Sequence, residues 1–274
     1  MLLALLELLG FLAFVPQAAL SVFDLVAYSP IRQCDPFNVS FYGGQPPAAL
    51  PLTLTVVPFN STPISFTIPE SAWDNATNSG SYSTFLPLPA GVALMASLDD
   101  AAGNGAAPVS EVIQVQPSND TSCISTEMAV PAIFQLVGST VSQCTPFTVS
   151  RNSSSLANRL SVRAFVPTAL SSSLHMVAFH ASQATDTFTY TMSVAQGFQV
   201  ALLFDDGQGN HQVSDLLSVM GGESSPSECL SASSTPSATQ ALARGAGVQG
   251  LSRSASFLIE RCREVNQLSL GLQP

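Results

Sequence analysis

Apolar and polar residues alternate with a period of two in several short segments of the chain. In the segment FNVSFY (residues 37–42), apolar side chains at positions 37, 39 and 41 are separated by Asn38, Ser40 and Tyr42. Successive side chains of a strand point to opposite faces, so this pattern predicts a strand with one buried and one exposed face. No apolar stripe with the period of a helix continues through the chain, which favours an all-β protein.

Further short runs of β-branched and aromatic residues recur, with Pro, Gly, Asn and Ser between them. Each such run predicts a strand. The predicted strands in the first half are 37–42, 52–57, 64–68, 82–88, 92–98 and 112–115. Those in the second half are 134–141, 160–166, 175–181, 187–194, 198–204 and 216–220. About six or seven short strands in roughly 100 residues are typical of a two-sheet sandwich.

The second half of this pattern repeats the first. The opening QCDPFNVS (residues 33–40) returns as QCTPFTVS (residues 143–150). Further matches are Val57-Pro58 with Val166-Pro167, Asp99-Asp100 with Asp205-Asp206, and Cys123 with Cys229. A period near one hundred residues indicates duplication of a whole domain rather than a solenoid of small units. We therefore predict two tandem immunoglobulin-like β-sandwich domains, at residues 22–125 and 130–230.

Each copy has one cysteine near its start and one near its end. In an oxidising compartment the natural disulfides are Cys34–Cys123 and Cys144–Cys229, because this pairing makes each copy self-contained. The sequence alone permits other connectivities, and reduced core cysteines or a zinc site are the alternatives. A zinc site is disfavoured because no two cysteines have CxxC spacing and no histidine stands beside one. Antibody-type domains carry their cysteines on inner strands, whereas here the cysteines bracket each copy. The predicted domains therefore resemble immunoglobulin domains in architecture only.

The first twenty residues form an apolar run that is broken by Glu7 and then by Pro16 and small residues. This segment (1–20) is interpreted as a secretory signal peptide with cleavage near Ala19 to Ser21. It lacks a basic residue at its start, so a retained signal anchor is the alternative.

Five Asn-X-Ser/Thr sequons follow this segment. They are acceptors for N-glycans if the chain enters the secretory pathway. The acceptors are Asn38, Asn60, Asn75, Asn119 and Asn152. We expect an extracellular glycoprotein.

The charge composition removes some classes of partner. Only 9% of the residues are charged, and all eight basic residues are arginines. Residues 22–230 hold 15 acidic and 4 basic residues. Such an acidic body repels nucleic acid and anionic lipid headgroups, so we expect no nucleic-acid partner.

The quoted repeats resemble the extracellular regions of a family of fungal surface proteins. The segments QCDPFNVSFYGG and GSYSTFLPLPAGVALMASLDDAAGNG, with their counterparts in the second copy, are similar to tandem modules of secreted or cell-surface proteins from mushroom-forming, basidiomycete-type fungi. GSYSTFLPLPAG is more distantly similar to the β-sandwich of the yeast cell-wall synthesis (Kre9/Knh1-like) family and of Ser/Thr-rich GPI-anchored proteins. The resemblance implies a wall or adhesion module and carries no catalytic residues.

The chain departs from that family at its end. Residues 231–274 begin as a Ser/Thr/Pro linker and continue with a segment that has no apolar run long enough to span a membrane or to act as a GPI signal. We expect a disordered tail and no membrane span in the mature chain. The alternatives are a divergent soluble form, an altered reading frame, or one amphipathic helical patch.

One polar motif occurs in both copies, as LDDAAGNG (98–105) and FDDGQGNH (204–211). Its carboxylates and the following Asn104 or Asn210 offer oxygen ligands for calcium. The spacing misses the alternation of a calcium loop, and Asp, Asn and Gly are the residues that build turns. We predict a hairpin turn and no metal site.

The sequence offers no catalytic set. His175 and His180 lie five residues apart, which places them on opposite faces of a regular strand, and His211 is far away in the sequence. No GxSxG, HExxH or phosphate-binding glycine motif occurs. Asp99 and Asp100 are neighbours that would diverge on a strand, so a glycosidase pair is not indicated. We predict no enzyme and no cofactor.

The predicted function is therefore a structural or interaction module at the fungal cell surface or wall. Wall polysaccharide and another surface protein are the predicted partners. The alternative is a carbohydrate-binding module, for which the aromatic platform is sparse because the chain has one tryptophan, Trp73. We expect Trp73 to be a partly buried anchor of its loop. A hydrolase is the least favoured hypothesis.

Overall fold

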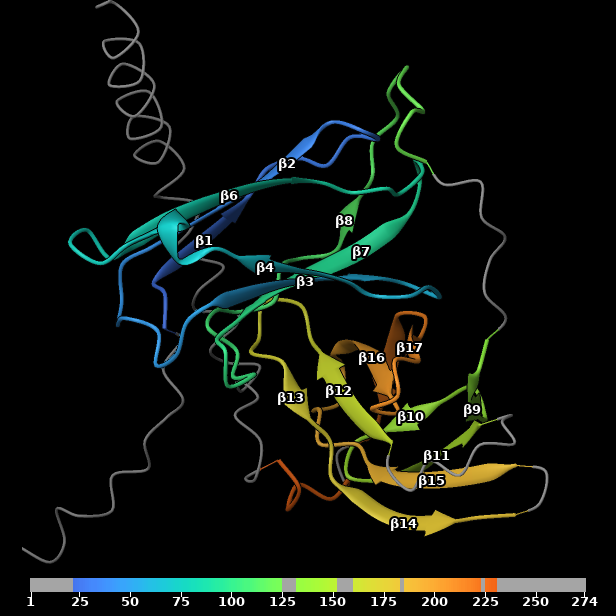
Figure 1. The fold of residues 1–274 in the computed structure, drawn as a ribbon. Helices are drawn as coiled ribbons and strands as arrows, with labels where there is room; N and C mark the ends of the chain where they lie inside the picture. Colours follow the sequence, from blue (N-terminus) through green and yellow to red (C-terminus); the bar gives the residue numbers. More distant parts are fainter. Residues whose placement is uncertain (1–21, 125–131, 152–159, 183–184, 223–224, 231–274) are drawn as a thin grey trace, which may run out of the picture. The chain divides into compact units, whose positions relative to one another are not determined.

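The computed structural model of the protein describes residues 22–124, 132–151, 160–182, 185–222 and 225–230. In this part of the chain the protein is all-β, with one short 3-10 helix, η2 (Glu70–Ala72) (Figure 1). No helix among these residues is long and apolar enough to cross a membrane. The predicted signal segment, the tail after residue 230, and Asn152 lie outside the described residues.

The first copy is a sandwich of two antiparallel sheets. One sheet has the strand order β1-β2-β6-β5, with β1 (Leu25–Tyr28), β2 (Pro36–Tyr42), β6 (Ser79–Phe85) and β5 (Trp73–Asp74). The other has the order β4-β3-β7-β8, with β4 (Ile64–Ile68), β3 (Leu52–Pro58), β7 (Ala93–Asp99) and β8 (Ile113–Gln114). A core that includes Phe37, Val39, Leu54 and Leu98 lies between them.

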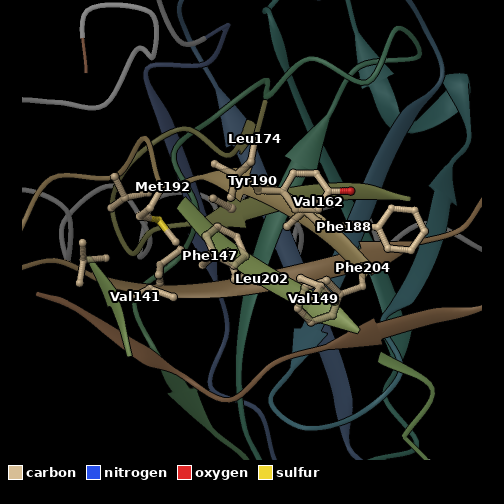
Figure 2. Close-up of a cluster of buried hydrophobic side chains, with 14 of the residues drawn as sticks. Val141, Phe147, Val149, Val162, Leu174, Phe188, Tyr190, Met192, Leu202 and Phe204 are labelled. Atoms are coloured by element: carbon tan, nitrogen blue, oxygen red, sulfur yellow. The ribbon is translucent and has the colours of Figure 1, made fainter. Parts of the chain in front are cut away.

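The second copy is also a sandwich of two sheets, which are antiparallel except for the parallel pair β10–β18. One sheet has the order β14-β15-β11-β9, with β14 (Met176–His180), β15 (Asp186–Thr191), β11 (Pro146–Arg151) and β9 (Phe134–Val137). The other has the order β10-β18-β16-β12-β13, with β10 (Val141–Ser142), β18 (Leu217–Met220), β16 (Gln199–Asp205), β12 (Ser161–Phe165) and β13 (Ser172–Ser173), while β17 (His211–Val213) pairs with β16. Aromatic and aliphatic side chains from both sheets meet in its core (Figure 2).

The alternation in residues 37–42 is confirmed. In β2 the side chains of Phe37, Val39 and Phe41 are buried and those of the intervening residues are exposed. Residues 134–141, predicted as one strand, instead form β9 and β10, which belong to different sheets. The chain turns between them at Gly138, whose φ of 101° suits glycine.

Other differences also have local causes. Residues 82–88 were expected as a strand, but β6 runs from Ser79 to Phe85. Pro87 and Pro89 follow it, and proline has no N–H for the ladder of a sheet. Five strands were not predicted, and three of them have only two or three residues. The five are β1, β5, β11, β13 and β17.

The two sandwiches share a third apolar cluster. Val57, Met95 and Val109 of the first copy pack there with residues of the second. The second copy contributes Phe165, Ala201 and Val213. This packing explains why β3 and β7 are buried along almost their whole length, instead of alternating as a sheet with one solvent face would.

Main-chain hydrogen bonds also join the two sandwiches. The Val109 N–H donates to the Ala169 carbonyl at 2.8 Å, and the Thr168 N–H donates to the Val109 carbonyl at 3.0 Å. At a second place the Val213 N–H donates to the Ser61 carbonyl at 2.8 Å. Apolar packing and main-chain hydrogen bonds therefore both cross from one copy to the other.

Candidate functional site

The repeated acidic motif forms the same turn in both copies. In the first copy the Asp100 carboxylate accepts hydrogen bonds from the Ala102 and Asn104 N–H groups, at 3.0 and 2.8 Å, and from the Asn104 side chain at 3.3 Å. In the second copy Asp206 accepts the corresponding bonds from Gln208 and Asn210. The predicted hairpin turn is confirmed, because both carboxylate oxygens are engaged inside the loop.

The electrostatics of the second turn follow from these contacts. Burial favours the neutral form of Asp206, but hydrogen bonds from Asn210 and Gln208 and the charge of Arg151 outweigh it and lower the pKa of the carboxyl. Asp206 therefore stays ionised as the acceptor at the centre of its turn.

The preceding acidic residue points elsewhere in each copy. Asp99 is buried and accepts hydrogen bonds from both terminal nitrogens of Arg163 in the second copy, one of them at 2.9 Å. Asp205 lies 3.4 Å from Nδ1 of His211 at a half-exposed site. Neighbouring carboxylates thus diverge, as predicted for a strand.

The three histidines are exposed. His175 directly precedes the exposed strand β14, His180 is the last residue of that strand, and His211 lies on β17 beside Asp205. Among the described residues, no group of three His, Cys, Asp or Glu side chains is placed to hold a metal ion.

Both predicted disulfides are present. Cys34–Cys123 has a Cα–Cα distance of 5.3 Å, and Cys144–Cys229 one of 5.5 Å. Cys34 and Cys144 adopt nearly the same left-handed backbone conformation, with φ of 58° and 52°. The two copies therefore share the backbone conformation at the first cysteine of each disulfide.

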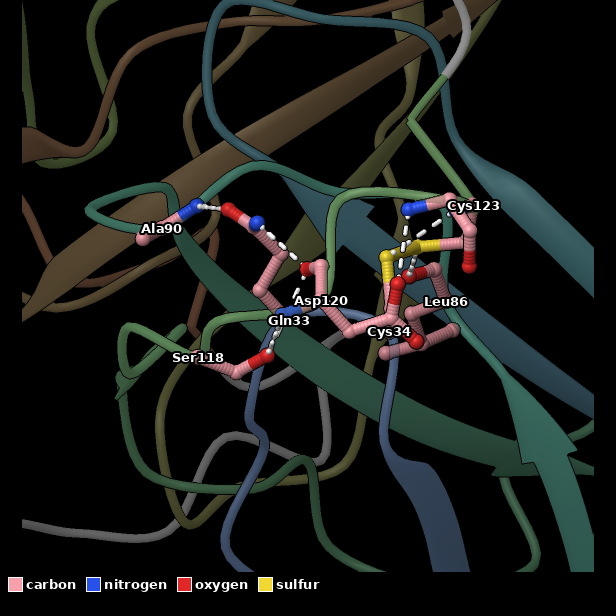
Figure 3. Close-up of a disulfide and its surroundings, with 8 residues drawn as sticks. Gln33, Cys34, Leu86, Ala90, Ser118, Asp120 and Cys123 are labelled. Carbon is pink, nitrogen blue, oxygen red and sulfur yellow. Dashed lines mark hydrogen bonds between the residues drawn. A yellow bond between two sulfur atoms is a disulfide. The ribbon is translucent and has the colours of Figure 1, made fainter.

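A glutamine next to each disulfide braces the same two segments in both copies. In the first copy Gln33 donates to the Asp120 carbonyl at 2.8 Å and accepts from the Ala90 N–H at 2.9 Å (Figure 3). In the second copy Gln143 donates to the Pro226 carbonyl at 2.6 Å and accepts from the Gln196 N–H at 2.8 Å. The contacts of these buried amides explain why each repeat begins with Gln-Cys. The role of the two glutamines is structural.

Four of the five predicted glycan acceptors are described, and all four are exposed. Asn38 points outward from β2, and Asn60 lies in a turn after β3. Asn75 lies in the loop between β5 and β6, and Asn119 lies close to the first disulfide in sequence. These positions are accessible to a glycan.

The most exposed strand of the second copy is β14. All five of its residues are exposed, including Met176 at 37%, Val177 at 54% and Phe179 at 38%. It is the last strand of its sheet and pairs with β15 alone among the described strands. A sheet edge of this kind presents unpaired main-chain groups to other chains.

A shallow hollow of about 490 Å³ lies at the edge of the first copy. Its lining comes from η2, β5 and the start of β6. The residues are Ser71, Ala72, Trp73, Asp74, Ser79, Gly80 and Ser81. Trp73 is half-buried there, and its ring lies 5.4 Å from that of Phe23 and 6.1 Å from that of Phe41. This agrees with the expectation of a partly buried anchor.

The sequence did not predict the roles of the two arginines in the second copy. Arg151 is fully buried and lies 3.6 Å from Asp186 and 3.5 Å from Asp206. Arg163 joins the two copies through Asp99. The available signal was the rarity of basic residues. The chain has no lysine and eight arginines, and Arg151 and Arg163 lie in strands of the described part.

No protein-family model and no curated protein matches the sequence. Among solved structures, the chain is similar to SGBP-B of the Bacteroides ovatus mixed-linkage glucan utilization locus, solved with a mixed-linkage heptasaccharide. That likeness has 15% identity, 70% coverage of this chain, 43% coverage of the other and a TM-score of 0.24. The ICAM-5 D1–D4 ectodomain fragment is similar at 14% identity, 72% and 54% coverage and a TM-score of 0.24. The chain thus spans about half the length of these proteins, and likenesses this low carry no argument about function.

Proposed function

We propose that the protein is a non-enzymatic extracellular module of a fungal cell surface or wall, which works by binding other surface molecules. Two disulfide-stapled sandwiches suit an oxidising compartment. Four exposed glycan acceptors and the resemblance to fungal surface proteins support the same location. In the repeated motif, the carboxylates of Asp100 and Asp206 accept hydrogen bonds from their own turns. These contacts support a structural role for both side chains.

The observation that carries the proposal is the exposed edge strand β14. From Met176 to His180 it has no acidic residue, no arginine and no proline, although the chain has a net charge of −10. Natural edge strands are commonly protected by charges, proline or β-bulges. This one has neither an acidic residue, an arginine nor a proline, although its register with β15 shifts between Met176 and Ala178. An edge with exposed apolar side chains and no such charge is suited to strand addition, in which main-chain hydrogen bonds bind a second strand.

The occupant that best fits this edge is β14 of a second copy. Antiparallel pairing about a two-fold axis at Ala178 places Val177 opposite Phe179 of the second copy. Two acidic chains repel one another over most of their surface, and β14 is a stretch where they can meet without facing carboxylates. Pairing there joins two four-stranded sheets into one continuous sheet.

The test is the oligomeric state of the full chain secreted from a eukaryotic host. Sedimentation over a range of concentrations is expected to show a reversible dimer. Val177→Lys places a charge on the edge and is expected to give a monomer. Val137→Lys is the matched control, because Val137 is 60% exposed and lies on β9, the opposite edge of the same sheet.

Two results contradict pairing through β14. One is a wild-type chain that stays monomeric at all concentrations. The other is a Val177→Lys variant that dimerises as strongly as wild type while circular dichroism shows that both are folded.

A second candidate function is polysaccharide binding, favoured by the hollow beside Trp73. An indole next to serine hydroxyls offers an apolar face and hydrogen-bonding groups to a sugar ring. Sedimentation with insoluble β-glucan, comparing wild type with Trp73→Leu, tests this function. Binding that depends on Trp73 supports it, and equal recovery of both proteins in the supernatant contradicts it.

A further inference from the structure

The hollow beside Trp73 lies next to a glycan acceptor. Trp73 and Asp74 form β5 and pair with Gly80 and Ser79 of β6, so residues 75–78 make the connecting loop. Asn75 is the first residue of this loop and directly follows Asp74, which lines the hollow. A sugar on Asn75 therefore starts at the rim of the hollow.

The loop that carries Asn75 is held in one conformation. The Asp74 carboxylate accepts hydrogen bonds from the Ala76 N–H and the Thr77 hydroxyl, both at 2.8 Å. These bonds lower the pKa of Asp74, led by the one from Thr77. Asn78 has a φ of 48°, and its side chain donates to the Gly43 carbonyl at 2.6 Å. The acceptor is consequently presented on a fixed turn.

Trp73 is placed to receive a sugar ring. The indole contacts the rings of Phe23 and Phe41, and the side chain is only partly buried where it lines the hollow. The partner of Trp73 in the ladder is Gly80, which has no side chain to cover the ring. The C–H groups of a pyranose carry partial positive charge and contact an aromatic face favourably. Ser79 and Ser81 also line the hollow.

The other sequons lack this arrangement. The residue two positions before the acceptor is proline at Asn38, Asn60 and Asn119, and serine at Asn152. Asn75 is the one acceptor of the five with an aromatic residue at that position.

We infer that the hollow is the seat of the protein's own glycan: the first N-acetylglucosamine on Asn75 stacks on Trp73 and closes the open edge of the first sandwich. This inference rests on the proposed extracellular location, since the sugar is added in the secretory pathway. The same chemistry fits a sugar of an external polysaccharide, and the experiment below separates the two sources.

The experiment uses the fluorescence of Trp73, which is the single tryptophan of the chain. The full chain is secreted from a eukaryotic host, and peptide masses give the occupancy of each sequon. Iodide quenching is then compared among wild type, Asn75→Gln and Asn38→Gln. Trp73 is expected to be protected in wild type and Asn38→Gln, and more readily quenched in Asn75→Gln.

Trimming distinguishes the first sugar from the rest of the glycan. An endoglycosidase that leaves one N-acetylglucosamine is expected to keep the protection, and an amidase that removes it is expected to abolish the protection. The wild-type melting temperature should fall by about 2–4 °C on removal of that sugar, the shift expected for roughly 1 kcal/mol in a chain of this size. In Trp73→Leu the same removal should change the melting temperature much less.

The outcomes separate this inference from the proposed function. An occupied Asn75 with unchanged quenching after removal of the sugar overturns the inference alone. A bare Asn75 overturns it as well, and if the other sequons are also bare the extracellular location fails with it. Protection of glycosylated wild type by added soluble β-glucan shows that the hollow is open, which overturns the inference in favour of polysaccharide binding.

Discussion

Arg151 faces Asp186 across strands β11 and β15, with 3.6 Å between Nη2 and Oδ2. At the matching position of the first copy, Phe41 faces Gly80 across β2 and β6. A Cβ atom added to Gly80 would lie 2.5 Å from the Phe41 ring, so the first copy has no room for a side chain there. At this buried pair of positions, the first copy thus has an aromatic ring opposite a glycine, and the second copy has an arginine opposite an aspartate.

This difference predicts a large effect of removing the cation. Arg151→Met leaves Asp186 and Asp206 buried beside an apolar side chain, and we expect a loss of about 3–5 kcal/mol in the free energy of unfolding. Urea unfolding measures it. The double variant Arg151→Phe, Asp186→Gly copies the pair of the first sandwich and should recover much of the loss. A single variant as stable as wild type contradicts the assignment.

A second prediction concerns the ion pair between the copies. The Asp99 side chain is 4% exposed and that of Arg163 is 21% exposed. Arg163→Ala leaves a buried carboxylate without its cation, while Asp99→Ala leaves an arginine that can reach water. Arg163→Ala should therefore be the more destabilising change, by about 3 kcal/mol against wild type.

The control for this pair is Arg32, which lies 3.8 Å from Asp35 at an exposed site. Arg32→Ala should change the free energy of unfolding by less than about 1 kcal/mol. A double-mutant cycle on Arg163 and Asp99 isolates their coupling. A coupling near zero would mean that the two sandwiches are held by apolar packing and main-chain hydrogen bonds alone.

These arginines mark the limit of what the sequence could predict. The alternation at residues 37–42, the duplication and the disulfide pairing follow from local patterns and from symmetry between the copies. The burial of both faces of β3 and β7 depends on contact with the other sandwich, which a period-two pattern does not encode. For the same reason Asp99 was interpreted only as part of a turn, and its partner Arg163, 64 residues away, was not foreseen.

The candidate surfaces were predicted less well than the fold. Residues 175–181 were correctly identified as a strand, but nothing in their composition distinguishes an edge strand from an inner one. The exposure of Val177 depends on the order of strands in the sheet. The role of Trp73 as a partial anchor was predicted from its usual burial, and the hollow beside it required the pairing of β5 with β6.

The two disulfides provide a third prediction with an internal control. Cys34 and Cys123 close a loop with a sequence separation of 89, and Cys144 and Cys229 one of 85. Replacing either pair by alanine should lower the free energy of unfolding by about 4–5 kcal/mol in the chain-entropy model. Similar losses for both pairs are expected, because the loops are similar in length. A much smaller loss for one pair would show that the corresponding copy is supported mainly by its neighbour.

The last prediction concerns the stability of the fold at acidic pH. The folded pKa of Asp206 is lowered, so the carboxyl is ionised in the fold at pH values where the unfolded chain, with a pKa of about 3.9, begins to bind a proton. Its contribution is therefore complete above about pH 5, declines below about pH 4 and is lost as the pH falls through the folded pKa. Asp206→Asn removes this titration. Urea unfolding of both proteins between pH 6 and pH 2 should show a stability difference in favour of wild type that shrinks with falling pH. A difference independent of pH would mean that the turn needs only an oxygen acceptor at position 206 and not its charge.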